Sequence, residues 1–190
     1  KCPNMSFTVL EGRSAIGGTW DLFRYPGIRS DSDMYTFGFS FYPWKDPQSI
    51  ADGPSILKYI NETVDSFDLR KNIKFNKKVV ESNWDSEKKT WSVDILDSQT
   101  KTVEKIECKF LFMCSGYYNY EKGYEPEFPN IDAFNGVKIH PQKWDETLDY
   151  TDKEIVIIGS GATAVTLLPK LAEKAKKVTM LQRSPTYIMN

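Results

Sequence analysis

The chain has 190 residues, enough for one ordinary domain, and its 40% hydrophobic and 27% charged content is that of a globular protein. Its 25 basic and 26 acidic side chains leave a formal net charge of -1, which argues against partners such as nucleic acid or an anionic membrane surface. No run approaches the roughly 18 consecutive apolar residues of a membrane span, and Lys1 opens no signal-peptide pattern, so we expect a cytoplasmic protein.

The first predicted element is a strand over residues 6–10, an apolar run typical of a buried parallel strand. No earlier segment could pair with it, and the strand predicted over residues 178–181 has only just begun near the other end. We therefore expect the chain to be an internal piece of a longer protein. Residues 12–44 are rich in Gly, Pro, Ser, Asp and aromatic residues without periodicity, which predicts a long ordered loop of the kind that is usually functional.

Helical and strand signals follow in turn. Apolar residues recur at helical spacing over residues 54–67, which predicts an amphipathic helix with a proline in its first turn. Three β-type runs at residues 73–84, 90–96 and 103–108 are joined by short polar segments and predict an antiparallel meander. The apolar run at residues 110–114 predicts one more strand.

Three cysteines make an odd count, and Cys108 and Cys114 lie on the run that reads as a strand. Six strand residues span about 20 Å, whereas the Cα atoms of bridged cysteines lie within roughly 7 Å of each other. A redox disulfide between these two residues is therefore not expected.

The last 40 residues predict a strand (155–158), a glycine turn, a helix (162–176) and a strand (178–181), which together form a βαβ unit. The turn and the start of the helix read GxGxxA. The two glycines allow a tight turn and close approach of a pyrophosphate, and the helix N-terminus offers free N–H groups and the positive end of its dipole. A glycine-rich turn in an ordinary βαβ unit is the alternative. The motif residues are Gly159, Ser160, Gly161, Ala162, Thr163 and Ala164.

The end of the second strand bears on the choice of dinucleotide. An NAD-binding unit normally carries an acidic residue there, about 20 residues after the first glycine. Here Gln182 takes that place, and Arg183 and Ser184 follow. Because a guanidinium and a hydroxyl would bind a 2′-phosphate that a carboxylate would repel, the sequence favours NADPH over NADH.

A second nucleotide pattern lies at the start of the chain. Glu11 directly follows the first predicted strand, where a dinucleotide-binding fold holds a ribose. The glycines after it would let a phosphate approach the backbone, the threonine offers a hydroxyl, and the tryptophan could form a wall against a planar ring. A turn whose tryptophan packs in the core is the alternative. The residues of this candidate site are Glu11, Arg13, Gly17, Gly18, Thr19 and Trp20.

These motifs, with the Arg-Tyr-Pro-Gly-Ile-Arg-Ser-Asp run at residues 24–31, resemble the FAD-binding half of flavin monooxygenases. Residues 134–145 fit FxGxxxHxxxW followed by Pro or Asp, the fingerprint of type I Baeyer–Villiger monooxygenases, whereas the related N- and S-oxygenating enzymes usually carry Tyr or Phe in place of the tryptophan. The stretch from residues 148–150 to the second glycine motif is similar to the ethionamide-activating monooxygenase subgroup. The fingerprint residues are Phe134, Gly136, His140 and Trp144.

The resemblance covers essentially the whole chain and implies an α/β fold with two Rossmann-like nucleotide-binding domains, both partial, and an antiparallel β-meander insertion. Residues 1–133 would be part of the FAD-binding domain, with the meander near 73–108. Residues 134–150 would form the interdomain linker, and residues 151–190 would begin the NADP-binding domain. The first GxGxxG and the family's catalytic arginine would lie outside the chain, so we expect this piece to be inactive alone.

The resemblance also implies roles for single residues. Glu11 would hold the FAD ribose, Thr19 and Trp20 would contact the flavin nucleotide, and the backbone of Val79 would meet the adenine. Asp31, beside the flavin and near the nicotinamide, would be the catalytic residue that tunes the charge of the absent arginine. The implied NADP-facing wall consists of Arg29, Ser30 and Asp31.

Two features keep more than one interpretation. His140 is the only histidine and could serve as a general base, but the fingerprint implies that it orders the linker. The aromatic residues between positions 35 and 44 could line a substrate pocket, although such clusters are more often core.

The implied function is a monooxygenase that uses FAD, NADPH and O2 to insert oxygen into ketones, giving esters or lactones, and also to oxidise sulfides. One alternative is an N- or S-oxygenating flavin monooxygenase, and another is a catalytically silent NADP(H)-binding protein. A flavin disulfide reductase is disfavoured because the chain has no closely spaced cysteine pair in a redox motif. We expect no metal, no nucleic acid and no membrane span, and the sequence does not specify the oligomeric state.

Overall fold

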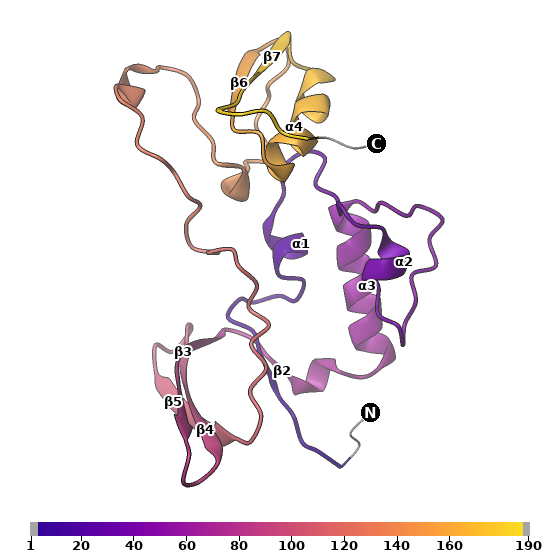
Figure 1. Cartoon of the computed structure of the whole chain (residues 1–190), viewed down its shortest axis with the longest axis vertical. Coiled ribbons are helices and arrows are strands. Elements are labelled where there is room, and N and C mark those ends of the chain that lie inside the picture. Colours follow the sequence, from indigo (N-terminus) through magenta and orange to yellow (C-terminus); the bar gives the residue numbers. More distant parts are fainter. Residues whose placement is uncertain (1–3, 188–190) are drawn as a thin grey trace. The chain divides into compact units, whose positions relative to one another are not determined.

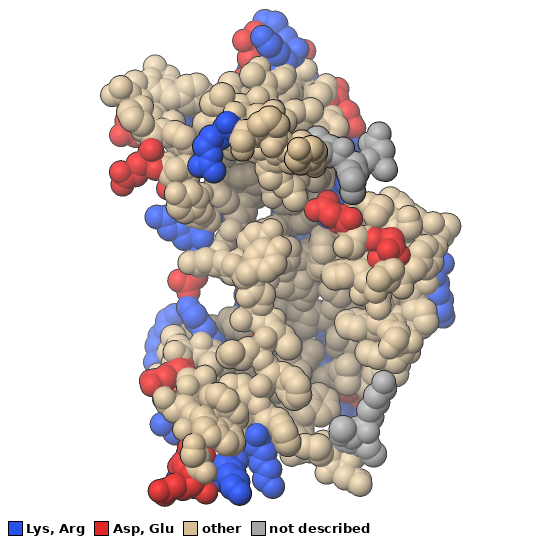
Figure 2. All heavy atoms as spheres, in the orientation of Figure 1, with Lys and Arg blue, Asp and Glu red and all other residues tan. Residues whose placement is uncertain are grey.

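The computed structural model describes residues 4–187 and divides the chain into two compact units. The first unit consists of Lys1–Gly18 and Tyr59–Tyr117, and the second of Thr19–Lys58 and Tyr118–Asn190. Figure 1 labels the α-helices and all strands except the first, and its colours follow the chain from the N-terminus (indigo) to the C-terminus (yellow). Basic and acidic side chains occur close together on the face shown in Figure 2, in keeping with the balanced composition. Within residues 4–187 no helix is both long enough and apolar enough to cross a membrane.

The N-terminal strand pairs in parallel, as predicted, but it is short. Strand β1 (Val9–Leu10) pairs with β2 (Ile73–Lys74). Residues 6–8 of the predicted strand are exposed and do not form strand, so the prediction was wrong in length and burial. A parallel strand is buried where elements cover both of its faces, and in the described part of this chain β2 is its one strand neighbour.

The predicted antiparallel meander is confirmed. Strands β3 (Lys77–Asp85), β4 (Thr90–Asp97) and β5 (Val103–Cys108) form a sheet in the order β3-β4-β5. The central strand β4 buries Val93 and Ile95, and these two side chains are each only 1% exposed.

The single run predicted at residues 73–84 is divided between two sheets. Asn76 has a φ of 59°, in the left-handed region that asparagine tolerates better than most residues, and the chain turns there between β2 and β3. The Asn76 N–H donates to the Arg13 carbonyl oxygen at 2.9 Å, which fixes this turn against the N-terminal segment.

The strand predicted at residues 110–114 is wrong. These residues form no strand, and Phe110, Phe112 and Met113 are 65%, 84% and 82% exposed. An apolar run becomes a strand only when a neighbouring strand satisfies its backbone groups, and none of the described residues provides one. Cys108 and Cys114 are both free thiols, but the continuous strand assumed in arguing against a disulfide between them is not formed.

The predicted helix is confirmed as α3 (Gly53–Ser66), which begins and ends one residue earlier than predicted. The Asp52 carboxylate accepts a hydrogen bond of 2.8 Å from the Ser55 N–H and so caps the N-terminus. Buried side chains recur at helical spacing along one face, namely Ile56, Tyr59 and Thr63.

Two short helices interrupt the predicted loop over residues 12–44, so that prediction was only partly correct. They are α1 (Thr19–Leu22) and α2 (Met34–Phe37). Helix α2 is capped by Asp33, whose carboxylate accepts from the Thr36 N–H at 2.9 Å, and its first residue, Met34, is 1% exposed. Local capping and one buried anchor thus create a helical turn that periodicity cannot reveal.

The C-terminal βαβ unit is confirmed. Strands β6 (Glu154–Ile158) and β7 (Lys177–Leu181) pair in parallel, and α4 (Ala162–Ala172) connects them (Figure 1). The helix ends four residues before the predicted end, where the chain turns. The main core of the second unit lies where α4 meets the loop after α1, and its buried members are Phe23, Tyr25, Ile28, Leu167 and Leu171.

Candidate functional site

Glu11 lies at the carboxyl end of β1, the end at which parallel sheets bind ligands. Its backbone extends the pairing: the Glu11 N–H donates to the Lys74 carbonyl oxygen and the Lys77 N–H donates to the Glu11 carbonyl oxygen, both at 2.9 Å. The Glu11 carboxylate accepts from the Arg13 N–H at 2.8 Å. The half-buried carboxylate is therefore held in place at the strand end, as a ribose acceptor would need to be.

The turn after Glu11 requires its glycines. Gly17 and Gly18 have φ values of 112° and 51°, which side chains with a Cβ rarely adopt. The Arg13 guanidinium donates to the Gly18 carbonyl oxygen at 3.1 Å and closes the turn. Arg13 thus stabilises the loop that the sequence assigns to a nucleotide.

Thr19 and Trp20 begin α1. The Thr19 hydroxyl lies 3.3 Å from the Tyr120 hydroxyl, and the Thr19 carbonyl oxygen accepts from the Phe23 N–H at 3.0 Å. The half-buried Trp20 packs against the core of the second unit and also lines a pocket. A tryptophan that packs in the core can therefore also present a wall to a ligand.

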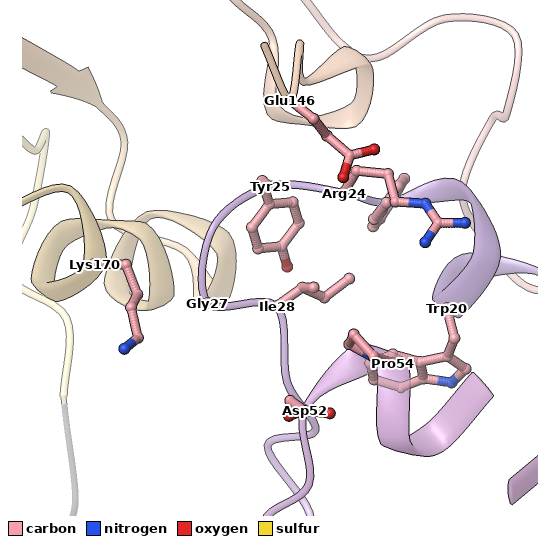
Figure 3. A pocket seen from close by; sticks show the side chains of 10 residues that line it. Trp20, Arg24, Tyr25, Gly27, Ile28, Asp52, Pro54, Glu146 and Lys170 are labelled. Carbon is pink, nitrogen blue, oxygen red and sulfur yellow. The ribbon is translucent and has the colours of Figure 1, made fainter. Parts of the chain in front are cut away.

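That pocket lies within the second unit and has a volume of about 360 Å³. Figure 3 shows Trp20 and Pro54 together on one side of it, with Glu146 and Lys170 contributed by other segments. Its lining includes two basic and two acidic side chains and does not include Asp31 or the second glycine motif. The lining residues are Trp20, Phe23, Arg24, Tyr25, Gly27, Ile28, Asp52, Pro54, Glu146 and Lys170.

The loop at residues 24–31 packs on α4 through Tyr25 and Gly27. Tyr25 is 9% exposed, and its burial raises the pKa of its hydroxyl; a hydrogen bond with the Thr163 side chain opposes this shift in pKa and the Asp31 carboxylate adds to it. Gly27 has a φ of 80°. The loop that carries Asp31 is therefore fixed against the helix that begins at the second glycine motif.

The three residues of the expected NADP-facing wall differ in exposure. Arg29 and Asp31 are exposed, whereas Ser30 is 4% exposed. The Ser30 hydroxyl donates to the Ser32 carbonyl oxygen at 2.6 Å and accepts from the Ser32 N–H at 3.1 Å. Ser30 therefore shapes the turn from within, while the two charged side chains face outward.

The second glycine motif lies between β6 and α4. Gly159 has a φ of 120°, and its N–H donates to the Leu181 carbonyl oxygen at 2.8 Å. Among residues 4–187, a Cβ there or at Gly161 would meet no atom within 4 Å. Gly161 is the N-cap of α4, whose first turn has no side-chain cap, and Ala164 is buried at 7% exposure. A helix N-terminus without a side-chain cap is what the predicted pyrophosphate site requires, and the assignment remains a prediction.

The structure brings Arg183 and Ser184 to the same sheet edge as this motif. Both are exposed and follow β7, which ends beside Gly159. The Thr186 hydroxyl donates to the Ser160 hydroxyl oxygen at 2.8 Å, so the chain after β7 folds back along the glycine turn.

Val79 lies in the first unit on β3, where the register to β4 shifts between Val79 and Glu81. Such a bulge leaves backbone groups outside the regular ladder and often occurs near functional sites. The side chain of Val79 is 42% exposed. The adenine contact assigned to its backbone remains a prediction.

The linker fingerprint has a clear local geometry. The Phe134 ring covers Gly136, where a Cβ would lie 2.4 Å from the ring carbon Cζ. His140 Nδ1 accepts from the Gln142 N–H at 3.2 Å and caps the short helix Pro141–Lys143. Trp144 packs on the core with its ring centroid 6.2 Å from that of Tyr150. His140 thus caps a short helix within the fingerprint, and its role in ordering the linker remains a prediction.

Three residues that contact candidate site or fingerprint segments in the structure were not identified from the sequence: Tyr25, Tyr120 and Gln142. The side-chain amide of Gln142, 7% exposed as a residue, donates to the Asn119 carbonyl oxygen. These contacts join residues far apart in the chain, and no local spacing marks them. The sequence offered one hint for two of them: Gln142 lies within the fingerprint and Tyr25 within the 24–31 run.

Comparison with known proteins gives consistent matches. The FAD-containing monooxygenase EthA of Mycobacterium tuberculosis is 54% identical over 191 residues, which cover 100% of this chain and 39% of that protein. The structure of oxidised steroid monooxygenase bound to NADP is 29% identical with a TM-score of 0.81, covering 97% of this chain and 35% of that one. The structure of OTEMO in complex with FAD and NADP is 30% identical with a TM-score of 0.77, and the match covers 95% of this chain and 35% of that one.

The chain thus spans about 39% of the length of the curated relative it matches. The likeness to these solved structures confirms the predicted fold class and the resemblance on which it was based. The sequence pattern of the family described as flavin-binding monooxygenase-like matches residues 24–190. This chain therefore belongs to the flavin-binding monooxygenase-like family.

Proposed function

We propose that the complete protein carrying this chain is a monooxygenase that uses FAD and NADPH to insert oxygen from O2 into a small-molecule substrate. The observation that carries the proposal is the second glycine turn, where Gly159 and the uncapped N-terminus of α4 share a sheet edge with Arg183. The names of the relatives support the same reading, since EthA is called FAD-containing and OTEMO was solved with FAD and NADP.

The N-terminal segment has the groups that FAD would need. The carboxylate of Glu11, at the strand end, would accept from the ribose hydroxyls, and the backbone at Gly17 and Gly18 leaves room for close approach. The Thr19 hydroxyl would contact the flavin nucleotide. FAD bound there would supply the redox chemistry that couples NADPH oxidation to O2.

The second motif would hold NADPH. The free N–H groups of the first turn of α4 would bind the pyrophosphate, and the Arg183 guanidinium with the Ser184 hydroxyl would bind the 2′-phosphate. Arginine suits this role because its planar group can make two hydrogen bonds to one phosphate and keeps its charge. A dinucleotide without the 2′-phosphate would lack this contact.

We further propose Baeyer–Villiger oxidation of ketones to esters or lactones, with sulfides as additional substrates. Trp144 favours this class over the N- and S-oxygenating relatives, which usually carry Tyr or Phe at that position. The exposed Asp31 carboxylate would act on an arginine outside this chain, because a carboxylate beside a guanidinium stabilises the charged form of both groups.

The test uses the complete open reading frame. The purified protein is mixed with NADPH, air and either a cyclic ketone or an aryl sulfide, while flavin absorbance and oxygenated products are measured. Bound flavin with lactone formation would support the full proposal. Sulfoxide without lactone would move the protein to the heteroatom-oxygenating class, and a protein that binds no flavin would overturn the proposal.

A further inference from the structure

The hydroxyls of Thr19 and Tyr120 meet in the second unit at a distance of 3.3 Å. The two residues are 101 positions apart, and both are partly buried. Thr19 opens α1 directly after the glycine turn, whereas Tyr120 belongs to the irregular connector between the meander and the linker fingerprint. This contact therefore joins Thr19, a residue of the candidate flavin site, to a segment for which the motifs assign no site residue.

The connector is held at three further points around Tyr120. On one side, the Tyr118 ring meets the Phe23 ring edge-on, with centroids 5.0 Å apart and an interplanar angle of 73°. On the other, the buried Gln142 amide donates to the carbonyl oxygen of residue 119. Gly123 lies so close to the His140 imidazole that a Cβ there would be 2.2 Å from Cε1.

These contacts make Tyr120 part of a fixed element rather than a free side chain. Three consecutive connector residues, 118 to 120, each contact a different partner. Two of the four anchors, His140 and Gln142, belong to the linker fingerprint, and they are bonded to each other through the 3.2 Å hydrogen bond between Gln142 N–H and His140 Nδ1. The fingerprint thereby positions the Tyr120 hydroxyl.

We propose that Tyr120 is a positioning residue for the flavin site, where its hydroxyl orients that of Thr19 and the linker fingerprint holds Tyr120 in place. The inference rests on the proposed function, because it takes Thr19 as a contact of the flavin nucleotide. The inference adds a residue that lies outside both glycine motifs and outside the fingerprint.

The chemistry of the pair explains why the tyrosine hydroxyl matters. A hydroxyl has one proton to donate and can accept two hydrogen bonds. When Tyr120 donates to the Thr19 oxygen, the Thr19 proton remains for an acceptor oxygen of the nucleotide, and the accepted bond strengthens that donation. Without the Tyr120 hydroxyl the threonine hydroxyl rotates among its staggered positions, so nucleotide binding is weakened while the fold is kept.

The test compares variants of the complete protein by titrating flavin-free protein with FAD. Tyr120→Phe keeps the ring and removes the hydroxyl, and we expect the Kd for FAD to rise about 3- to 10-fold, as for one net hydrogen bond. The melting temperature of the flavin-free protein should not change. The matched control is Tyr124→Phe, in the same connector with a side chain 85% exposed, and its Kd should equal that of the unmodified protein.

A double-mutant cycle separates positioning from a general structural effect. In a Thr19→Val background, Tyr120→Phe should cause no further rise in Kd, because the tyrosine acts through the threonine hydroxyl. An unchanged Kd for Tyr120→Phe alone, or the same fold-rise in both backgrounds, would overturn the inference while leaving the proposed function intact. An unmodified protein that binds no FAD would overturn both.

Discussion

Gly27 approaches α4 so closely that a Cβ on it would lie 3.1 Å from the Thr166 carbonyl oxygen and 2.6 Å from Cγ of Lys170. The backbone at Gly27 also has a φ of 80°, in the region that favours glycine. This contact seats the loop that carries Asp31 on the helix of the second glycine motif. The loop and the helix therefore share one core.

Replacing this glycine should destabilise the protein. Gly27→Ala adds a methyl group against α4 and keeps an unfavourable φ, and we expect a loss of about 1–3 kcal/mol in the free energy of unfolding. Thermal or denaturant unfolding would measure it. Gly12→Ala is the control, because a Cβ there meets its nearest atoms at 3.8 Å and no positive φ applies. Equal stability of the two variants would contradict the packing account.

Arg183 should determine the preference for NADPH. Arg183→Gln removes the charge expected to face the 2′-phosphate, and the KM for NADPH should rise about 10-fold or more, as for a hydrogen bond to a charged group. The KM for NADH should change little. Lys177→Gln, at an exposed position at the other end of β7, controls for the loss of one positive charge away from the expected 2′-phosphate. An equal effect on both dinucleotides would mean that Arg183 does not contact the 2′-phosphate.

Asp31 should matter for catalysis and not for flavin retention. Its exposed side chain makes Asp31→Ala compatible with the fold, so the variant should purify with FAD. We expect its rate of lactone formation to fall at least about 10-fold, since the variant removes a charged hydrogen-bond partner that would hold the arginine guanidinium in place. Asp132→Ala, at a fully exposed carboxylate, is the control. Unchanged lactone yield would refute the role of Asp31.

Asp97 should contribute to the acid sensitivity of the meander. Its carboxylate accepts from the Thr100 and Gln99 N–H groups and pairs with Lys77 at 3.0 Å, which lowers its pKa from 3.8 to about 2. Because the folded pKa lies below the unfolded one, this stabilisation is present above about pH 4 and is lost as the pH falls toward 2.

The measurement is the melting temperature between pH 5 and 2. The melting temperature of Asp97→Asn should fall less on acidification than that of the unmodified protein. Asp132→Asn, which replaces an exposed carboxylate, should leave the decline as it was. A decline of the same steepness in Asp97→Asn would show that this carboxylate does not contribute to it.

The elements that the sequence predicted well are those with local patterns. Helix α3, the meander and the βαβ unit each follow from a repeat of apolar residues and from turn residues within a short window. The strand predicted at residues 110–114 was wrong because an apolar run indicates burial, whereas a strand also needs a neighbouring strand to pair with. The split at Asn76 depends on one backbone conformation inside an otherwise continuous β-type run.

The candidate site divides in the same way. Both glycine motifs could be proposed from the sequence because phosphate binding needs particular residues at fixed spacing, and the positive φ of Gly159 shows that this position favours glycine. By contrast, the contact of Gly27 with α4 and the pairing of Tyr120 with Thr19 join distant segments, and their residue types fit many other environments. Such positions emerge only when the chain is folded.

The most direct test of the central claim follows a single oxygen atom. The complete protein, with its flavin bound, is reduced by NADPH without oxygen and then mixed with 18O2 and a cyclic ketone, and the product is analysed by mass spectrometry. The account predicts loss of flavin absorbance on reduction and one labelled oxygen atom in the lactone. A flavin that NADPH does not reduce, or a product without label, would contradict it.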